Sequence, residues 1–444
     1  MARIVFFVRN TNQSSFIISS GFVEVTKRIS SVFNVSLIRK EMIMSSETPA
    51  TTPGSSSAVP ATPSPGTDAS RQSTSVRLVS LDALRGFDMF WIIGGKSMLV
   101  ALATVTSAAW LQWVVARMHH PLWDGFAPYD LIFPLFLFIA GVSTPMSIQH
   151  RRGRGDSDRK IYIHIVLRGI ILVLLGIVYN GIPVDWSTTE GWVNHRYPSV
   201  LGRIGLAYMF AALIAMNTKW LGRWLWLIGL LIGYWAALRF IPVPGFGAGD
   251  LSPGHTLTDY IDRLLIPGHL YHGDRDPEGL LATIPAIATA LLGVITGQML
   301  MRRDRSGWRK TLMMVLGGVV CVGLGWGWDQ EFLLRFPINK NLWSSSFVLY
   351  CGGWSLLLLA LFYLVIDVFK FRWGVTFFTV IGANSILIYM APSFINFKFT
   401  AKSILAGPSS LTETWAPLIL VVGVFALKWL LLYALYRKKI FLKV

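Results

Sequence analysis

Residues 118–148 read MHHPLWDGFAPYDLIFPLFLFIAGVSTPMSI and decide much of the fold. The stretch ends in about twenty predominantly apolar residues, enough to cross a bilayer as one helix. Two adjacent histidines, His119 and His120, and two carboxylates, Asp124 and Asp130, lie at the start of that helix. Because titratable side chains are costly at a membrane boundary, this cluster indicates a functional site beside a membrane span.

The whole chain has the composition of a membrane protein. Of its 444 residues, 53% are hydrophobic and 14% are charged, and the mean hydropathy is +0.53; soluble domains carry about 25% charged residues. The formal charge of +17 does not indicate nucleic-acid binding, because the basic residues fall in short clusters between apolar segments. Cys321 and Cys351 both lie in apolar segments, so neither a disulfide framework nor a thiolate metal site is expected.

The N-terminal region differs from the rest of the chain. Residues 45–75 are mostly Ser, Thr, Pro and Ala, which predicts a disordered tail over residues 1–75. A start near Met42 or Met44 would remove the leading residues without touching the core, and we expect those residues to have no function. The remainder, 76–444, is predicted to be one transmembrane domain.

The apolar segments predict an all-α polytopic membrane protein with about ten transmembrane helices. The expected spans are 83–105, 128–148, 160–180, 199–217, 221–241, 281–301, 311–328, 344–367, 374–392 and 414–436. Basic clusters fall in loops that all lie on one side under this count, namely Arg151, Arg152, Arg154, Arg159 and Lys160; Arg302, Arg303, Arg305, Arg309 and Lys310; Lys370 and Arg372; and Arg437, Lys438 and Lys439. The positive-inside rule makes that side cytoplasmic and places both termini there. The loops with most of the histidines then face outward.

The first expected helix carries four charged residues. Asp82 and Arg85 are three residues apart and can neutralise one another near the interface. Asp88 and Lys96 lie deeper, two turns apart on one side of the helix. They need partners or a water-filled cavity, which favours a functional cavity over a purely structural pair.

The histidine pair has a structural and a catalytic interpretation. Imidazole has an ordinary pKa of about 6.5, which suits proton transfer near neutral pH, although an isolated interfacial histidine is usually structural. Asp124 or Asp130 could orient a histidine ring, as a carboxylate does in a catalytic triad. Trp123 could be only an interfacial anchor. No metal-ligand spacing such as HExxH is present, so no metal is expected.

Two further outward segments are rich in polar residues. Residues 260–281 contain His269, His272, Asp276 and Glu278, either as part of a site or as a solvated loop whose Pro277 starts the next helix. Residues 338–343, INKNLW, combine Asn339, Lys340, Asn341 and Trp343. Amides can bond sugar hydroxyls and an indole can stack on a sugar ring, but a polar cap with an interfacial Trp explains the same residues. Asn384 and Ser385 are expected to interrupt the helix over 374–392.

Taken together, these segments resemble the heparan-α-glucosaminide N-acetyltransferase family, including its bacterial relatives. The matching motifs occur in order: LDALRG (81–86), HPLWDG (120–125), YDLIFPLFLFIAG (129–141), LGRIGLAY (201–208), YIDRLL (260–265), HLY (269–271), DPEGLLATI (276–284), INKNLW (338–343), GANSILIY (382–389) and LYRKKIF (435–441). They cover nearly the whole expected membrane domain, so the resemblance is specific although no single motif is.

The resemblance implies a membrane-embedded enzyme that takes acetyl from cytoplasmic acetyl-CoA and delivers it to the amine of a glucosamine-type sugar on the outer face. The family's active-site histidine corresponds to His120, which precedes Trp123 by three residues, with Asp124 or Asp130 orienting it. His120 would act as general base or would carry the acetyl group transiently. The implied sugar contacts are His269, Asp276, Glu278, Asn339, Lys340, Asn341 and Trp343. The implied contacts to acetyl-CoA are Asp88, Lys96, Arg151, Arg152 and Arg154.

The resemblance also implies a homodimer in the inner membrane of a bacterium, with no metal. The luminal domain of the animal members is not recognisable in the sequence, which favours cell-envelope or scavenged amino sugars as acceptors. Two other functions fit the residues. A sugar or muropeptide transporter would also need intramembrane charges, but no internal repeat of the kind found in many transporters is visible. An O-acetyltransferase of an envelope glycan would use the same donor.

Overall fold

The computed structural model describes residues 78–181, 187–330, 334–407 and 412–442. The chain divides into two units, Met1–Ser73 and Thr74–Val444, and every described element belongs to the second. The expected disordered tail over residues 1–75 and the alternative start near Met42 or Met44 lie outside the described residues and stay predictions.

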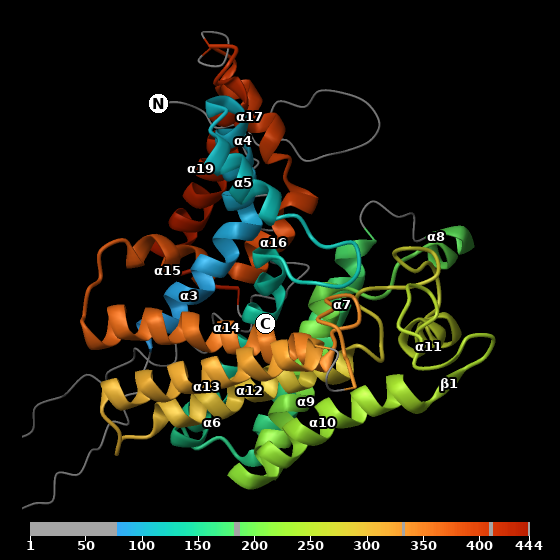
Figure 1. Cartoon of the computed structure of the whole chain (residues 1–444). Helices are drawn as coiled ribbons and strands as arrows, with labels where there is room; N and C mark the ends of the chain where they lie inside the picture. The colour runs from blue at the N-terminus through green and yellow to red at the C-terminus, as the bar shows by residue number, and fades with distance from the viewer. Residues whose placement is uncertain (1–77, 182–186, 331–333, 408–411, 443–444) are drawn as a thin grey trace, which may run out of the picture. The chain divides into compact units, whose positions relative to one another are not determined.

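The described part of the chain is almost entirely helical (Figure 1). Its elements are α3 (Val79–Phe90), η1 (Trp91–Gly95), α4 (Lys96–Thr106), α5 (Ala109–Arg117), η2 (Pro128–Leu131), α6 (Ile132–Gly153), α7 (Asp158–Asn180), α8 (Thr189–Val193), α9 (Val200–Asn217), α10 (Trp220–Phe240), β1 (Pro242–Val243), β2 (Gly247–Ala248), α11 (Leu257–Leu265), α12 (Thr283–Met301), α13 (Gly307–Asp329), α14 (Ser345–Tyr363), η3 (Leu364–Val368), α15 (Val375–Ala383), α16 (Ser385–Phe394), α17 (Phe397–Ile404) and α19 (Ala416–Arg437). The two strands form one short antiparallel hairpin.

The number of membrane helices agrees with the sequence. Among the described residues, nine helical segments are long and apolar enough to cross a membrane, and the bent pair α15–α16 makes ten if it is one span. This confirms the all-α polytopic fold and makes the chain an integral membrane protein. The cytoplasmic location of the termini stays a prediction.

Two of the expected helices are broken. The first continues from Val79 to Thr106 but contains a π-helical turn, η1, with a non-helical residue at Gly94. A side chain at Gly94 would meet the ring of Phe425, so the glycine lets α19 approach closely at this point. The second break bends α15 and α16 by 65° at Asn384, as that residue and Ser385 suggested. The Asn384 amide donates to the Ile440 carbonyl and its oxygen accepts from Leu442 N–H, so it holds the chain's last described residues.

Close helix contacts use glycine. A Cβ at Gly141 of α6 would clash with the Ala290 carbonyl of α12, and Cβ atoms at Gly293 and Gly297 would clash with the carbonyls of Phe138 and Val142. Small residues therefore let the two backbones touch, as is common between membrane helices. Since these contacts advance in the same direction along both helices, α6 and α12 run parallel.

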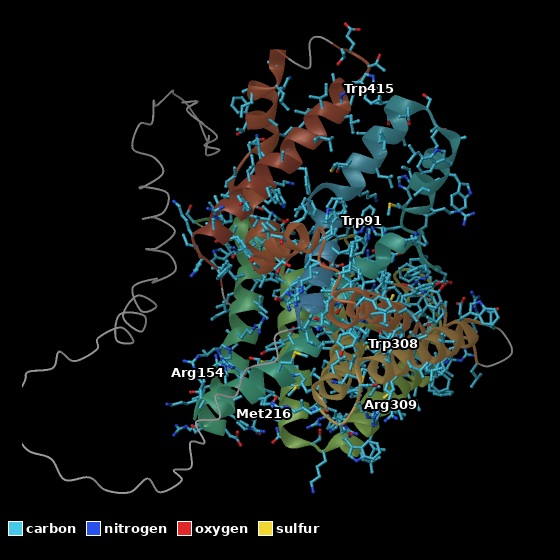
Figure 2. The ribbon with its side chains drawn as sticks, turned by 90° about the vertical axis from the view of Figure 1, so that its left-hand side faces the viewer. Trp91, Arg154, Met216, Trp308, Arg309 and Trp415 are labelled. Carbon is cyan, nitrogen blue, oxygen red and sulfur yellow. The ribbon has the colours of Figure 1, made fainter. Side chains whose placement is uncertain are left out.

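This parallel arrangement separates two ends of the molecule. Helix α6 starts just after Asp130 and has 22 residues, which at 1.5 Å per residue span about 33 Å. Arg151, Arg152 and Arg154 therefore lie at the opposite end of α6 from Asp130. The basic residues that follow α12 lie at that same end, which we call the basic end; Figure 2 shows Arg154 and Arg309 in the same lower part of the view.

Candidate active site

The centre of the candidate site is a histidine bound to a buried carboxylate. His120 Nδ1 lies 2.5 Å from Asp130 Oδ1. The Asp130 side chain is 1% exposed, whereas the His120 ring is 42% exposed. The other oxygen of Asp130 accepts a hydrogen bond of 2.9 Å from the backbone N–H of Ala127, which fixes the carboxylate in the 3-10 turn η2. The ring is therefore held from one side by a rigid acceptor.

Two lysines lie around this pair. Lys340 Nζ is 3.2 Å from Asp130 Oδ1 and 3.5 Å from His120 Nδ1. Lys96 Nζ donates to the Met118 carbonyl at 3.3 Å and lies 4.3 Å above the ring of Tyr129. The structure therefore brings Lys340 and Lys96, which are far apart in the sequence, to the histidine segment. The positive charge of Lys340 favours an ionised Asp130.

A second set of bonds fixes the loop that carries His120. The Asp124 carboxylate accepts a 3.1 Å hydrogen bond from the Asn339 amide, and Gly125 N–H donates to the Ile338 carbonyl at 2.8 Å. Gly125 has φ of +119°, a conformation that side chains other than glycine's rarely tolerate. The Trp123 indole donates to the Leu251 carbonyl at 2.8 Å. Asp124 therefore holds the loop, while Asp130 is the carboxylate on the histidine.

Asn339 and Trp343 are buried within the protein. Asn339 is 0% exposed, and its oxygen accepts from Leu342 N–H while its amide reaches Asp124. Trp343 is 1% exposed, its indole donates to Thr289, and the Arg203 guanidinium lies 5.1 Å from the ring. Their polar atoms therefore serve the protein itself. Asn341 and Lys340 are partly exposed in the same segment.

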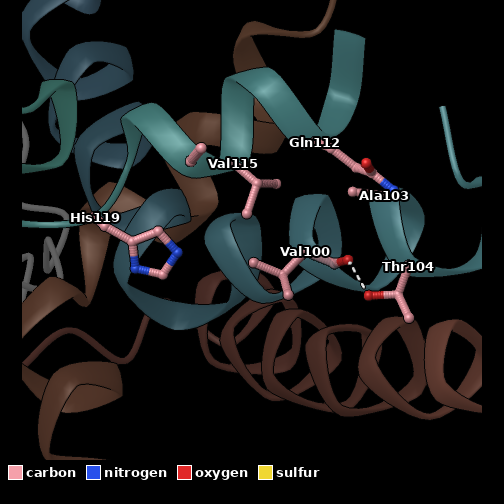
Figure 3. A pocket seen from close by; sticks show the side chains of 7 residues that line it. Val100, Ala103, Thr104, Gln112, Val115 and His119 are labelled. Carbon is pink, nitrogen blue, oxygen red and sulfur yellow. Dashed lines mark hydrogen bonds between the residues drawn. The ribbon is translucent and has the colours of Figure 1, made fainter. Parts of the chain in front are cut away.

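The two adjacent histidines differ in their surroundings. His119 lies at one end of a cavity of about 490 Å³ between α4 and α5, with Val100 and Val115 in its walls (Figure 3). The sequence did not predict α5, which lies in the loop after the first span. His119 faces this cavity, whereas His120 is bound to Asp130.

A second charged cluster lies in the outward loops predicted from the sequence. Both oxygens of Asp276 accept hydrogen bonds from the Arg196 guanidinium, at 2.8 and 2.7 Å, and Glu278 also pairs with Arg196. Tyr271 lies 4.6 Å from the Arg196 guanidinium. The Asp276 side chain is fully buried. The backbone N–H of His269 donates to the carbonyl of His195, the residue before Arg196, so His269 lies near this cluster. Its side chain is exposed.

Arg196 is the main residue that the sequence reasoning missed. Burial lowers the pKa of this guanidinium, but the hydrogen bond to Asp276 and the charge of Glu278 outweigh it and leave the pKa above its usual value. Arg196 is therefore a permanent cation between two carboxylates. One signal was present: it is a single arginine in a loop that the charge pattern places outward, where basic residues are otherwise sparse.

The expected contacts to acetyl-CoA do not form one cluster. Lys96 is close to the histidine segment, and Asp88 is 1% exposed, with neither oxygen bonded to any described residue. Arg151 and Arg152 lie at the basic end, where they pair with Asp156 at 3.4 Å and Asp158 at 3.0 Å. Arg154 lies beside them, just after α6. Within the described ranges, no three His, Cys, Asp or Glu side chains gather as a metal site.

The fold and this site define a class: a polytopic integral membrane protein with a histidine–carboxylate pair at one end of a spanning helix and basic loops at the other. No protein-family model matches the sequence. The chain is 30% identical over 423 residues to human heparan-alpha-glucosaminide N-acetyltransferase, covering 83% of the chain and 60% of that protein. It is 30% identical over 426 residues to the mouse protein of the same name, covering 84% and 61%.

The chain belongs to the same family as these two proteins, which confirms the family that the motifs predicted. It spans about 60% of the length of either relative. Family membership alone therefore does not carry their activity, substrates or partners over to this chain.

Proposed function

We propose that this protein is a membrane-embedded acetyltransferase that moves an acetyl group from acetyl-CoA to the amine of a glucosamine-type sugar. The observation that carries the proposal is the exposed imidazole of His120 held 2.5 Å from the buried carboxylate of Asp130. The names of the human and mouse relatives supply the transferred group and the class of acceptor.

The proposed chemistry uses the histidine as a general base. Asp130 accepts the Nδ1–H of His120, which leaves Nε2 as the basic nitrogen. Nε2 takes a proton from the acceptor amine while the amine nitrogen attacks the thioester carbonyl. The carbon–sulfur bond then breaks, Nε2 gives the proton to the departing sulfur, and CoA leaves as the thiol. Lys340, 3.2 Å from Asp130, keeps the carboxylate ionised through this cycle.

The other predicted site residues divide into buried residues that support the His120 loop and exposed residues that can contact the acceptor. Asn339 and Asp124 position the loop, and Trp343 forms the packed support behind it. Lys340 and Asn341, which are partly exposed, are the members of that segment available to the acceptor. Glu278 and the exposed His269 form the outer sugar contacts in this proposal, whereas the fully buried Asp276 holds Arg196 in place beside them.

Donor and acceptor reach the protein from opposite sides in this proposal. The basic loop after α6 lies about 33 Å from Asp130 along that helix, and the positive-inside rule assigns basic loops to the cytoplasm, where acetyl-CoA is made. Asp88 and Lys96, on the first span, would line the path of the pantetheine arm between the two ends. Arg151, Arg152 and Arg154 add to the positive field at the donor end. The likeness of the motifs to bacterial members supports an inner-membrane location; a homodimer stays a prediction.

The test is an assay in proteoliposomes, with labelled acetyl-CoA on one side and glucosamine on the other. The wild type should form labelled N-acetylglucosamine, and His120→Ala should lower the rate by about 10²–10⁴-fold, the usual contribution of a general base. His255→Ala is the matched control, since His255 also lies beside a carboxylate, at 2.9 Å, and is also 42% exposed. This control should retain the wild-type rate.

Each alternative gives a different result. Activity that survives His120→Ala at the control's rate contradicts the catalytic assignment. Unmodified sugar that crosses the membrane without labelling indicates a transporter. Label on a sugar hydroxyl instead of the amine indicates an O-acetyltransferase. Product that forms only when both substrates are on one side contradicts the proposed sidedness.

A further inference from the structure

We propose that the loop after η3, residues 369–374, binds the adenine nucleotide end of acetyl-CoA, an inference that rests on the proposed function. The loop reads FKFRWG and alternates aromatic with basic side chains. Phe371 is 58% exposed and Trp373 is 85% exposed. An adenine ring stacks on aromatic side chains, and phosphate groups attract lysine and arginine, so the loop has both groups that such a ligand needs.

A cavity lies directly beside these aromatic residues. It has a volume of about 270 Å³ and is lined by Phe371, Trp373 and Gly374 together with apolar residues of α3, α14, η3 and α15. Pockets for whole small molecules measure roughly 300–1,000 Å³. The cavity therefore suits one flat ring system, with the ribose and phosphates remaining outside it.

The cations beside the cavity carry charges that no described side chain neutralises. Lys370 and Arg372 are exposed, and neither forms an ion pair with a described residue. Arg151 and Arg152, by contrast, are each paired with an aspartate. A phosphate at Lys370 and Arg372 would meet uncompensated charge, whereas at Arg151 and Arg152 it would have to displace a carboxylate. Charge complementarity therefore favours the 369–374 loop over Arg151 and Arg152.

The position of the cavity fits the length of the donor. Trp308 lies in the first turn of α13, just after the basic loop that follows α12. Its ring centroid is 5.5 Å from that of Phe369, so residues 369–374 belong to the basic end. Ala83 of α3 lines the cavity, and the same span continues to Lys96 beside the histidine segment. Thirteen residues at 1.5 Å per residue give about 20 Å, a distance of the order that a pantetheine arm covers. A nucleotide at the loop therefore places the thioester near His120.

The direct test measures binding of adenosine 3′,5′-bisphosphate, which contains the nucleotide end of CoA without the thioester. Trp373→Leu should raise its Kd by about tenfold, the scale of one lost base–aromatic stack. Lys370→Gln combined with Arg372→Gln should raise the Kd at least as much and should remove most of its salt dependence. Trp373→Phe keeps an aromatic face and should retain binding.

The matched control is Trp220→Leu combined with Lys219→Gln. Trp220 is 65% exposed at the start of α10. Helix α7 begins at the basic end, and α9 runs antiparallel to it, so α9 ends there and α10 begins there. If residues 369–374 only anchor the protein in the membrane interface, these control substitutions and the loop substitutions will have the same small effect on the Kd. That result overturns the proposal.

A kinetic test separates this inference from the proposed function. With acetyl-CoA as donor, the loop variants should show a KM raised about tenfold and an unchanged kcat. With acetyl-pantetheine, which lacks the nucleotide, they should match the wild type. Equal losses with both donors contradict a nucleotide site. If the wild type transfers no acetyl group but still binds the nucleotide through Trp373, the proposed function fails and the binding site stands.

Discussion

The part of the chain that the structure describes contains two histidine–aspartate pairs that share the same residue types but differ in their surroundings. His120 and His255 are each 42% exposed and each lie within 3 Å of a carboxylate, Asp130 and Asp250 respectively. Asp130 is 1% exposed and also contacts a lysine and a backbone N–H, whereas Asp250 is 32% exposed. Only the first pair combines an accessible imidazole with an immobile, desolvated carboxylate.

The second pair is a local feature of a loop. His255 stacks on Phe246 with ring centroids 3.9 Å apart, and the N–H of Ser252 donates to Asp250 at 2.8 Å. That hydrogen bond, followed by those from the Ser252 hydroxyl and His255, lowers the pKa of Asp250. The partners of Asp250 all lie in its own loop, so the rest of the fold contributes little to its environment. The comparison shows that burial of the carboxylate, more than the histidine itself, distinguishes a candidate catalytic pair.

The largest expected effect comes from removing the charge of the buried carboxylate. Asp130→Asn should lower acetyl transfer by about 10²–10⁴-fold, because the histidine loses the group that orients it and favours its protonated form during the reaction. Asp250→Asn should leave the rate within about twofold of the wild type. Initial rates in proteoliposomes between pH 5.5 and 8.5 measure both, and the pH profile should change only for Asp130→Asn. Similar losses for the two variants would erase the distinction between the pairs.

The comparison extends to Asp276, a carboxylate buried against an arginine instead of a histidine. Arg196→Met should destabilise the fold by about 3–5 kcal/mol, because it leaves two carboxylates without their cation. The exposed pair Arg152–Asp158 provides the control: Arg152→Met should cost about 0–1 kcal/mol. Unfolding of the purified protein in detergent checks both values. A cost below that of the control would show that Asp276 is hydrated.

A smaller effect is expected where neutral groups hold the His120 loop. Asn339→Ala should cost about 1–3 kcal/mol, because Asp124 and the buried Leu342 N–H both lose a partner. Asn341→Ala, in the same segment but partly exposed, should change stability by about 0.5 kcal/mol or less. The same unfolding assay measures them. Equal costs would mean that burial does not separate the two amides.

The most gradual effect, spread over several pH units, concerns a buried carboxylate that forms no ion pair among the described residues. Asp262 accepts from Leu280 N–H, and its second oxygen is unbonded. Its pKa is raised from 3.8 to about 7, chiefly by burial; Asp259 and Asp276 also raise the pKa, whereas the hydrogen bond from Leu280 N–H and the charge of Arg203 lower it. Between those pH values the unfolded state releases the proton while the folded state keeps it, so stability should fall as pH rises.

The slope due to Asp262 should reach at most about 1.4 kcal/mol per pH unit and should end near pH 7, above which both states are ionised. Asp262→Asn should remove that contribution. Thermal unfolding of the wild type and the variant at pH 4.5, 6 and 7.5 gives the difference. Parallel curves would show that water reaches Asp262 in the folded protein.

Much of the fold could be predicted because lipid imposes a simple rule on the chain. Each expected span matches a helix to within a few residues, since about twenty apolar residues suffice to specify a membrane helix. The break at Gly94 and the short helix α5 were missed, because neither changes the apolar pattern. Asn384 was recognisable as an interruption, since a polar amide in an apolar helix needs partners that the sequence itself cannot identify.

The candidate site was less predictable. The motif around His120 was visible, but Asp124 and Asp130 were equivalent by residue type. The structure pairs Asp130 with His120 and Asp124 with Asn339. Arg196 was overlooked, because its partners Asp276 and Glu278 lie about eighty residues away in the chain.

The sequence by itself determined that the chain has about ten segments able to cross a bilayer, that loops rich in basic residues alternate with loops rich in histidine, and that the motifs belong to one family. Hydropathy and charge are local properties, so they can be read without knowing the fold. Only the tertiary structure decided which carboxylate meets which histidine and which lysine lies beside them. Those contacts join residues up to 220 positions apart, and their chemistry depends on burial that no single segment contains.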